Sequence, residues 1–151
     1  GVVWKPTANE EVIEIAYAST MDTPTSWTLS WIEFDFSSFT GNVGVDVDDE
    51  EYDMDVYITN NIFHSMSNHA NNLNPLRFSG KGYVMNNMFY NIIDDGDWAF
   101  AINFTHSAEA VGCYNNTVYK TEESLLAQTI TLRAIRRQTQ HLGLIALTVR
   151  F

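Results

Sequence analysis

One short pattern occurs three times in this chain of 151 residues and constrains its fold more than any other feature. Each copy has a short apolar stretch, then two adjacent asparagines, then a second apolar stretch. The copies span residues 56–63, 82–90 and 111–119, and their asparagine pairs are 26 and 29 residues apart. A repeat of this length is typical of a solenoid, in which each repeat supplies one strand to each of several parallel sheets.

The repeated asparagines have a physical role in such a fold. Asparagine tolerates the left-handed backbone conformation that a sharp bend requires. When it stacks on its copies in neighbouring repeats, its side-chain amide can donate and accept hydrogen bonds along the stack. We therefore predict that Asn60, Asn86 and Asn115, or their immediate neighbours, lie one above another at the same bend.

A second apolar stretch follows each asparagine pair after 14 to 16 residues. These stretches are residues 76–78, 100–102 and 130–132. Two features that recur in phase indicate a structural repeat rather than chance. We expect the third stretch to be the last strand of the repeat, because no asparagine pair follows it at the expected distance.

With these motifs the chain resembles the right-handed parallel β-helix superfamily, which includes pectate lyases and polygalacturonases. The segments that carry the resemblance are ITNNIFHS, VMNNMFYN and CYNNTVYK, together with DDGDWAFAINF before a strand. The resemblance implies an all-β chain that forms a right-handed parallel β-helix of about 3–5 coils. It also favours an extracellular or cell-surface location, and it is specific for a fold rather than for an activity.

The segment before the repeats is less regular. Thr7 and Glu10 have the spacing of a capping box, so a short helix could cap the N-terminal end of the core. The alternation of Val12 and Glu14 also permits a strand. Residues 27–36 alternate and predict a strand of an earlier, irregular coil, with Phe34 lying 26 residues before Asn60.

Charge divides the chain into two parts. All 19 acidic residues lie at or before Glu123, so residues 1–127 carry a formal charge of −15. The remaining residues contain four arginines and no acid, which gives +4. We expect residues 1–132 to form the β-helix body, with regular repeats over 55–132. The basic segment 133–151 would be a cap or an oligomerisation element, or else unrelated sequence after a truncated β-helix.

Composition narrows the classes of partner. The net charge of −11 argues against a nucleic-acid partner, because binding to phosphates needs a basic face. No apolar run approaches the roughly 18 residues that a membrane span requires. Cys113 is the single cysteine, so no intrachain disulfide can form, and we interpret it as a buried thiol.

Three carboxylates, Asp94, Asp95 and Asp97, occur at a predicted bend just before a strand. In the enzymes that this chain resembles, such carboxylates bind Ca²⁺ or form the acid–base pair of a glycosidase. The resemblance implies Asp94 and Asp95 as catalytic residues, and Asp95 and Asp97 as ligands of Ca²⁺. Arg77 or Lys81 could supply the base of a lyase. The alternatives are a polar turn for the carboxylates and surface ion pairs for the two basic residues.

Other side chains could bind a ligand. Trp98, Tyr90 and Tyr119 could stack on sugar rings if they face outward, because an aromatic face suits the apolar face of a sugar. The alternative for them is packing within the repeat. His64 and His69 could form a metal pair, although their spacing matches no known motif.

These features predict a carbohydrate-associated β-helix module that binds a polysaccharide, with Ca²⁺ as the candidate ion between an acidic protein and an acidic polymer. If it is an enzyme, it would be a polysaccharide lyase or a glycoside hydrolase. The sequence motifs of the lyases are absent, so we expect binding rather than efficient catalysis. The alternatives are a structural domain that forms a homo-oligomer through its solenoid ends, and a truncated β-helix without a selected activity.

Overall fold

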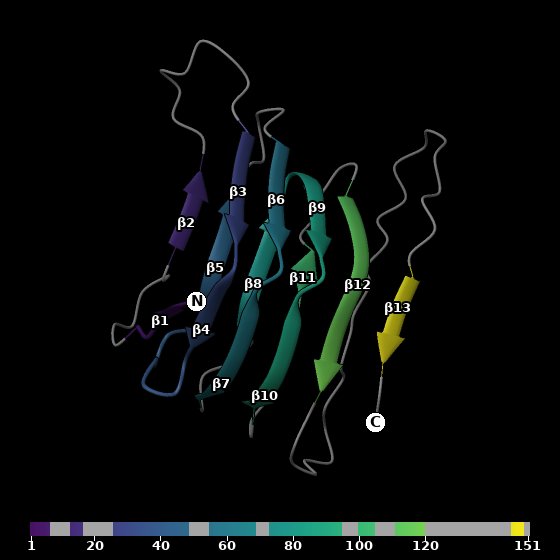
Figure 1. The fold of residues 1–151 in the computed structure, drawn as a ribbon. Helices are drawn as coiled ribbons and strands as arrows, with labels where there is room; N and C mark the ends of the chain where they lie inside the picture. Colours follow the sequence, from purple (N-terminus) through teal and green to yellow (C-terminus); the bar gives the residue numbers. More distant parts are fainter. Residues whose placement is uncertain are drawn as a thin grey trace.

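The computed structural model describes residues 1–6, 13–16, 26–48, 55–68, 73–94, 100–104, 111–119 and 146–149. These residues form thirteen strands in two parallel sheets, and none of them lies in a helix (Figure 1). The prediction of an all-β chain with parallel sheets is therefore confirmed for the described part. Within it, the two sheets are not closed into a complete solenoid. It also contains no helix that could cross a membrane.

The larger sheet has nine strands. They are β1 (Val2–Trp4), β3 (Ser26–Ser30), β4 (Ile32–Asp35), β6 (Asp55–Thr59), β7 (Ile62–Asn68), β9 (Lys81–Met85), β10 (Met88–Asp94), β12 (Val111–Tyr119) and β13 (Ala146–Val149). Their order is β1-β4-β7-β10-β12-β9-β6-β3, and β13 also pairs with β12. The long β12 therefore joins two rows of shorter strands, because its first half pairs with β9 and its second half with β10.

The smaller sheet has four strands in the order β11-β8-β5-β2. They are β2 (Ile13–Ala16), β5 (Val43–Asp48), β8 (Asn74–Ser79) and β11 (Asn103–Phe104). From β1 to β12, nearly every strand pairs with the strand three places later in the chain. This spacing follows from the sequence repeat, because each repeat contributes three strands that lie on those of the repeat before it.

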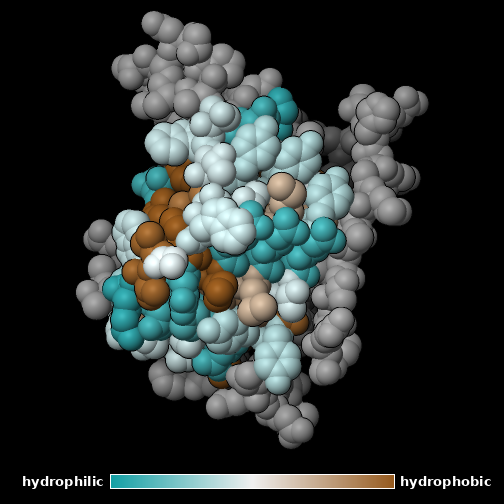
Figure 2. Space-filling view, in the orientation of Figure 1, coloured by the Kyte–Doolittle hydropathy of each residue, from teal (hydrophilic) through white to brown (hydrophobic). Residues whose placement is uncertain are grey.

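The first strands form an end of the larger sheet that exposes apolar side chains. Five of the eight large exposed hydrophobic side chains in the described part belong to Val2, Val3, Trp4, Trp27 and Trp31. In Figure 2, hydrophobic atoms gather on the side where β1 and β4 lie. Both β1 and β3 are terminal strands of the sheet order, so each pairs with only one neighbour among the described strands.

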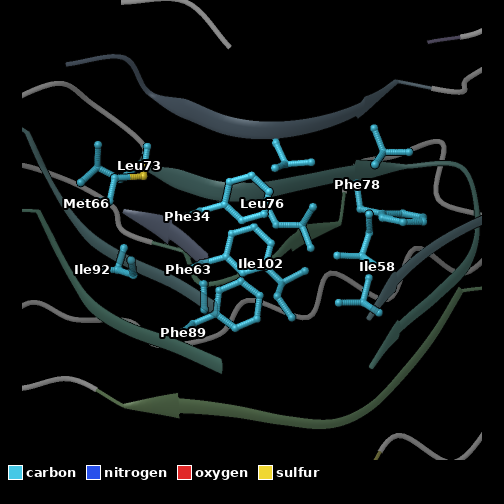
Figure 3. Close-up of a cluster of buried hydrophobic side chains, with 14 of the residues drawn as sticks. Phe34, Ile58, Phe63, Met66, Leu73, Leu76, Phe78, Phe89, Ile92 and Ile102 are labelled. Carbon is cyan, nitrogen blue, oxygen red and sulfur yellow. The ribbon is translucent and has the colours of Figure 1, made fainter. Parts of the chain in front are cut away.

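Stacked side chains from successive repeats fill the space between the sheets. Phe34, Phe63, Phe89 and Val118 are in register on neighbouring strands and are all buried. The centroids of Phe34 and Phe63 lie 4.8 Å apart, as do those of Phe63 and Phe89, and the rings are nearly parallel (Figure 3). This spacing equals the separation of paired strands, about 4.8 Å, so each ring packs directly on its equivalent.

A second stack comes from the other row of the larger sheet. Ile58, Val84 and Cys113 are in register and buried, and Leu29 extends the stack into β3. Residues of β5 and β8 belong to the same core, and Val45, Val47, Leu76 and Phe78 are fully buried there. The predicted apolar ladders are therefore confirmed.

The asparagine bend recurs as predicted. Asn60, Asn86 and Asn115 have φ angles of 57°, 57° and 52°, in the left-handed region. Asn60 separates β6 from β7, and Asn86 separates β9 from β10 at the same place in the next repeat. Asparagine occupies this region at lower cost than most residues with a side chain, which explains its recurrence here.

The second asparagine of each pair is buried and forms the hydrogen bonds. The backbone N–H of Asn61 donates to Oδ1 of Asn87 at 2.9 Å, and that of Asn87 donates to Oδ1 of Asn116 at 3.0 Å. The three amide groups also donate to main-chain carbonyls one repeat earlier, those of Leu29, Ile58 and Val84, each at 2.8 Å. Each bend is thereby bonded to the next.

The first repeat differs from the prediction in its alignment. Trp31 has φ 62° and occupies the place of Asn60, and the N–H of Ile32 donates to Oδ1 of Asn61 at 3.0 Å. Phe34 consequently pairs with Phe63 and not with Asn60. The 26-residue alignment of Phe34 with Asn60 is wrong, because a tryptophan at the bend conceals the repeat.

Three further expectations need correction or fall partly outside the described residues. Residues 13–16 form the strand β2, so for them the strand alternative is confirmed and the capping helix is wrong, and residues 7–12 lie outside the described part. The strand expected at 100–102 begins three residues later, at Asn103, which pairs with Arg77. The strand expected at residues 130–132 lies outside the described residues, and beyond it β13 pairs in parallel with β12.

We expect the substitution Asn87→Ala to lower the free energy of unfolding by about 3 kcal/mol. It removes the acceptor of the Asn61 N–H and the donor to the Ile58 carbonyl, and it leaves both groups buried without these partners. Urea unfolding followed by circular dichroism would measure the change. The matched control is Asn86→Gly, which keeps the left-handed bend and should change stability by much less. Equal losses of unfolding free energy in both variants would contradict the stabilising role of the Asn87 hydrogen bonds.

Candidate functional site

The side chain that follows each residue of the phenylalanine stack points away from the core, and these side chains form a polar row. Asp35, His64, Tyr90 and Tyr119 are in register on β4, β7, β10 and β12. We call these four residues the outer ladder. Within it, the rings of His64 and Tyr90 stack with centroids 4.8 Å apart and an interplanar angle of 1°. The repeat therefore builds a line of polar groups on the outer side of the sheet as regularly as it builds the core.

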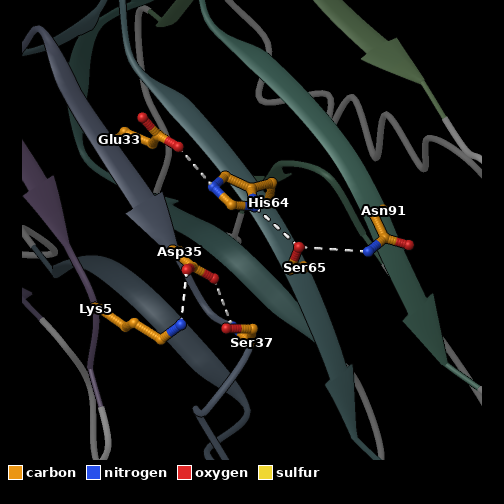
Figure 4. A network of polar contacts seen from close by, with 7 residues as sticks. All are labelled: Lys5, Glu33, Asp35, Ser37, His64, Ser65 and Asn91. Carbon is orange, nitrogen blue, oxygen red and sulfur yellow. Dashed lines mark hydrogen bonds and ion pairs between the residues drawn. The ribbon is translucent and has the colours of Figure 1, made fainter. Parts of the chain in front are cut away.

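His64 is held at both ring nitrogens (Figure 4). Its Nε2 lies 3.1 Å from Oε1 of Glu33, and its Nδ1 lies 2.9 Å from Oγ of Ser65. The side chain of His64 is 11% exposed, whereas that of Glu33 is 42% exposed. The imidazole is thus enclosed while its carboxylate partner meets solvent.

Ser65 and Asn91 lie at matching places in β7 and β10, and both have left-handed backbones. Their φ angles are 59° and 54°. Asn91 Nδ2 donates to the hydroxyl oxygen of Ser65 at 3.4 Å. Non-glycine residues in this region are uncommon, and such backbone strain is concentrated at sites with a function. The neighbouring strands β7 and β10 therefore share the same left-handed residue beside the outer ladder.

Asp35 is the most strongly perturbed acid of the described part. The backbone N–H of Ser37, then its hydroxyl, and then Lys5 favour the ionised carboxylate and lower the pKa of Asp35 from 3.8 to about 2. The Ser37 N–H lies 3.0 Å from Oδ1 of Asp35, and Lys5 Nζ lies 3.0 Å from Oδ2. This carboxylate remains charged at any pH near neutrality.

Tyr90 keeps its proton in the same surroundings. Desolvation raises its pKa above the ordinary value, and the charges of Glu33 and Asp35 raise it further. The phenol is therefore a neutral hydrogen-bond donor and acceptor next to two carboxylates. One face of its ring is covered by His64.

The sequence-predicted base Arg77 lies on β8 of the smaller sheet and is paired with Asp46. Its Nε donates to Oδ1 of Asp46 at 2.7 Å, and its Nη2 contacts Oδ2 of the same carboxylate. The Asp46 side chain is almost completely buried. Removal of Arg77 would leave that carboxylate without its guanidinium, so this pair has a clear structural role.

Lys81 begins β9 and lies 3.5 Å from Oδ1 of Asp55 on β6. Asp94 ends β10, where its backbone pairs with Asn68, and its side chain is outside the described part. Asp95, Asp97, Trp98 and His69 also lie outside the described residues. Among the residues that are described, no three His, Cys, Asp or Glu side chains are grouped to hold a metal ion. The catalytic and Ca²⁺-binding roles of these residues remain predictions.

Of the predicted ligand-binding aromatics, Tyr90 and Tyr119 belong to the outer ladder, and Tyr119 is exposed. Sequence reasoning did not find Glu33, Ser65 or Asn91. The available signal was the repeated phenylalanine: alignment of Phe34 with Phe63 places Asp35 on His64. The left-handed backbone at residues 65 and 91 could not be predicted in this way, because it does not change the pattern of apolar residues.

No known protein-family model, curated protein sequence or solved structure matches this chain. The chemistry of the outer ladder and its neighbours is therefore the basis for the functional argument.

We expect Asp35→Asn to destabilise the protein by about 1 kcal/mol at pH 7 and by almost nothing near pH 2. The ionised carboxylate stabilises the fold above the unfolded pKa of about 3.9, and this contribution disappears as the pH falls through the folded value of about 2. Urea unfolding at pH 7, 4 and 2 would test this. Asp48→Asn, at an exposed position of β5, is the control. A difference between wild type and Asp35→Asn that does not change with pH would contradict the assignment.

Proposed function

We propose that the chain is a short right-handed parallel β-helix that binds a polysaccharide along the outer ladder. The β-helix proposal is supported by three strands per repeat, by parallel pairing in register, and by a hydrogen-bonded asparagine at one bend. The described strands supply four successive levels of this arrangement at the outer ladder. The superfamily resemblance of the sequence supports the same fold.

The observation that carries the binding proposal is the regular spacing of polar groups in the outer ladder. A carboxylate, an imidazole and two phenols follow one another on strands about 4.8 Å apart. A linear polysaccharide presents hydroxyl groups at intervals of similar size. Carboxylates and phenols are suitable partners for those hydroxyls, because they accept or exchange hydrogen bonds in a fixed line.

The ladder favours hydrogen bonding over ring stacking for most of its length. Tyr90 has one face on His64, and Tyr57 and Tyr83, on the other row of the sheet, stack on each other at 5.7 Å. Tyr119 is the exposed aromatic of the outer ladder and could contact the apolar face of a sugar. The ligand would thus be held by polar contacts along the ladder and by one aromatic contact at its end.

Charge selects the class of polysaccharide. Residues 1–127 carry −15, and Glu33 and Asp35 lie at the ladder itself. An anionic polymer would be repelled unless a cation such as Ca²⁺ intervened. We therefore propose a neutral polysaccharide as the ligand, with acidic ones bound only in the presence of the ion.

We expect the wild-type chain to be retarded in affinity gels that contain a neutral plant or microbial polysaccharide, and Tyr119→Ala to bind about tenfold more weakly. The control is Tyr83→Ala, which removes an exposed tyrosine from β9, outside the outer ladder. Parallel gels with polygalacturonate, with and without Ca²⁺, test the charge argument. No retardation by any neutral polysaccharide would overturn the proposal, as would equal weakening by the two substitutions.

A second candidate function is assembly through the exposed end formed by β1 and β3. The apolar side chains of this end support it, above all Trp31, which is 71% exposed. Both strands are terminal in the sheet order of the described residues, and terminal strands favour pairing with another chain. In each row of the larger sheet, this end and β12 are at opposite extremes of the strand order.

If this candidate is correct, sedimentation velocity will show an oligomer that Trp31→Asn disrupts. Asparagine takes the same left-handed bend in the next three repeats, so this substitution removes the apolar surface without straining the backbone. Met88→Gln, which alters an exposed residue of β10, is the control. A wild-type monomer at all accessible concentrations would remove this candidate.

A further inference from the structure

We propose that Ser65, His64 and Glu33 form a hydrolytic centre for carboxylic esters, with Ser65 as the nucleophile. This activity goes beyond polysaccharide binding and does not depend on it. The three side chains come from two strands, β4 and β7, that are held in register by the core phenylalanines beside them.

The hydrogen bonds around His64 form a series in which each group donates to the next, from Asn91 to Glu33. A proton on Nε2 donates to the Glu33 carboxylate, which accepts only. Nδ1 then carries the lone pair and accepts from the Ser65 hydroxyl. The hydroxyl oxygen in turn accepts from the Asn91 amide. These three hydrogen bonds lead from the Asn91 amide through Ser65 and His64 to the negative charge of Glu33.

This arrangement meets the geometric requirements of nucleophilic catalysis. A hydroxyl lies within hydrogen-bond distance of a base, at 2.9 Å, and the base is oriented by a carboxylate at 3.1 Å. In serine proteases the serine bonds to Nε2 and the carboxylate to Nδ1, so the two ring nitrogens exchange roles here. Either nitrogen of a neutral imidazole can accept a proton when the other carries the hydrogen, so Nδ1 can serve as the base here.

The backbone around Ser65 supports a functional role. Its left-handed conformation is uncommon for a serine, and Asn91 has the same conformation at the matching place of β10. Asn91 also brings an amide N–H to 3.4 Å from the nucleophilic oxygen. An amide at this distance could turn to an oxyanion that develops on the bound carbonyl, which is the role of an oxyanion-hole donor.

The reaction follows the ordinary course of acyl transfer. Ser65 Oγ attacks the ester carbonyl carbon while its proton passes to His64 Nδ1. The tetrahedral intermediate expels the alcohol, which takes that proton, and the acyl group remains on Ser65. Water then attacks the acyl-serine with His64 as base, and releases the carboxylic acid and the free hydroxyl. Glu33 keeps its charge throughout and stabilises the imidazolium.

The surroundings select neutral esters with a small acyl group. Glu33 and Asp35 place negative charge near the site, so an anionic ester would be repelled. The imidazole is largely enclosed, which leaves little room beside it for a large acyl group. If the polysaccharide proposal also holds, O-acetyl groups on a neutral glycan are the corresponding natural substrates.

The first experiment treats the full chain with a fluorophosphonate probe and locates the adduct by mass spectrometry. We expect the label on Ser65 in the wild type, no label in Ser65→Gly, and wild-type labelling in the control Ser67→Ala. Glycine suits the left-handed backbone at position 65, so this variant should remain folded. Ser67 is exposed on the same strand, so its replacement tests general reactivity of surface serines. Circular dichroism and thermal unfolding confirm that each sample is folded.

The second experiment measures hydrolysis of p-nitrophenyl acetate, which contains no sugar. After subtraction of the uncatalysed hydrolysis, we expect kcat/KM to be at least 100-fold lower in Ser65→Gly and in His64→Gln than in the wild type. Glu33 is a positioning residue, so Glu33→Gln should lower kcat about tenfold or more while KM stays nearly unchanged. The proposal is overturned if folded wild type gives no adduct on Ser65, or if Ser65→Gly hydrolyses the ester as fast as wild type. Neither result bears on polysaccharide binding, so the two proposals fail separately.

Discussion

The hydrogen bonds of the buried asparagines are the interaction on which the rest of the structure depends. A sharp bend between two strands leaves backbone N–H and carbonyl groups that the sheets do not pair, and such groups are costly when buried. Asn61, Asn87 and Asn116 satisfy them at the same place in successive repeats, and so fix the register of one bend on the next. Two residues later the phenylalanines then stack ring on ring, and the core follows from the bend.

The same register determines the outer surface. Glu33 and His64 are 31 residues apart in the chain, yet the pairing of Phe34 with Phe63 brings their side chains into contact. A polar site can therefore be assembled from three repeats without a long loop, because each strand only has to carry one suitable residue next to a core position. The backbone strain that accompanies this site is local and falls on the left-handed Ser65.

Much of the fold could be predicted from sequence because the residues at the bends and in the core are chemically demanding. Few residue types suit the left-handed bend, and few can replace the buried amide that follows it, so the Asn-Asn pairs are recognisable in the sequence. Where Trp31 takes the bend instead, the alignment of the first repeat was lost. The site was less accessible, because Glu33, Ser65 and Asn91 are ordinary surface residues in the sequence. Their grouping depends on register, and the backbone twist at Ser65 has no marker in the apolar pattern.

The direction of the asparagine bonds has a consequence for synthesis on the ribosome. Each buried asparagine satisfies backbone groups of the repeat that precedes it: Asn87 accepts from the N–H of Asn61 and donates to the carbonyl of Ile58. A bend is therefore incomplete until the following repeat has emerged. Domains otherwise begin to fold from the N-terminus while the rest is being made. Here ordering should lag translation by one repeat, so a nascent chain would always carry one unfinished turn whose backbone groups still bond to water.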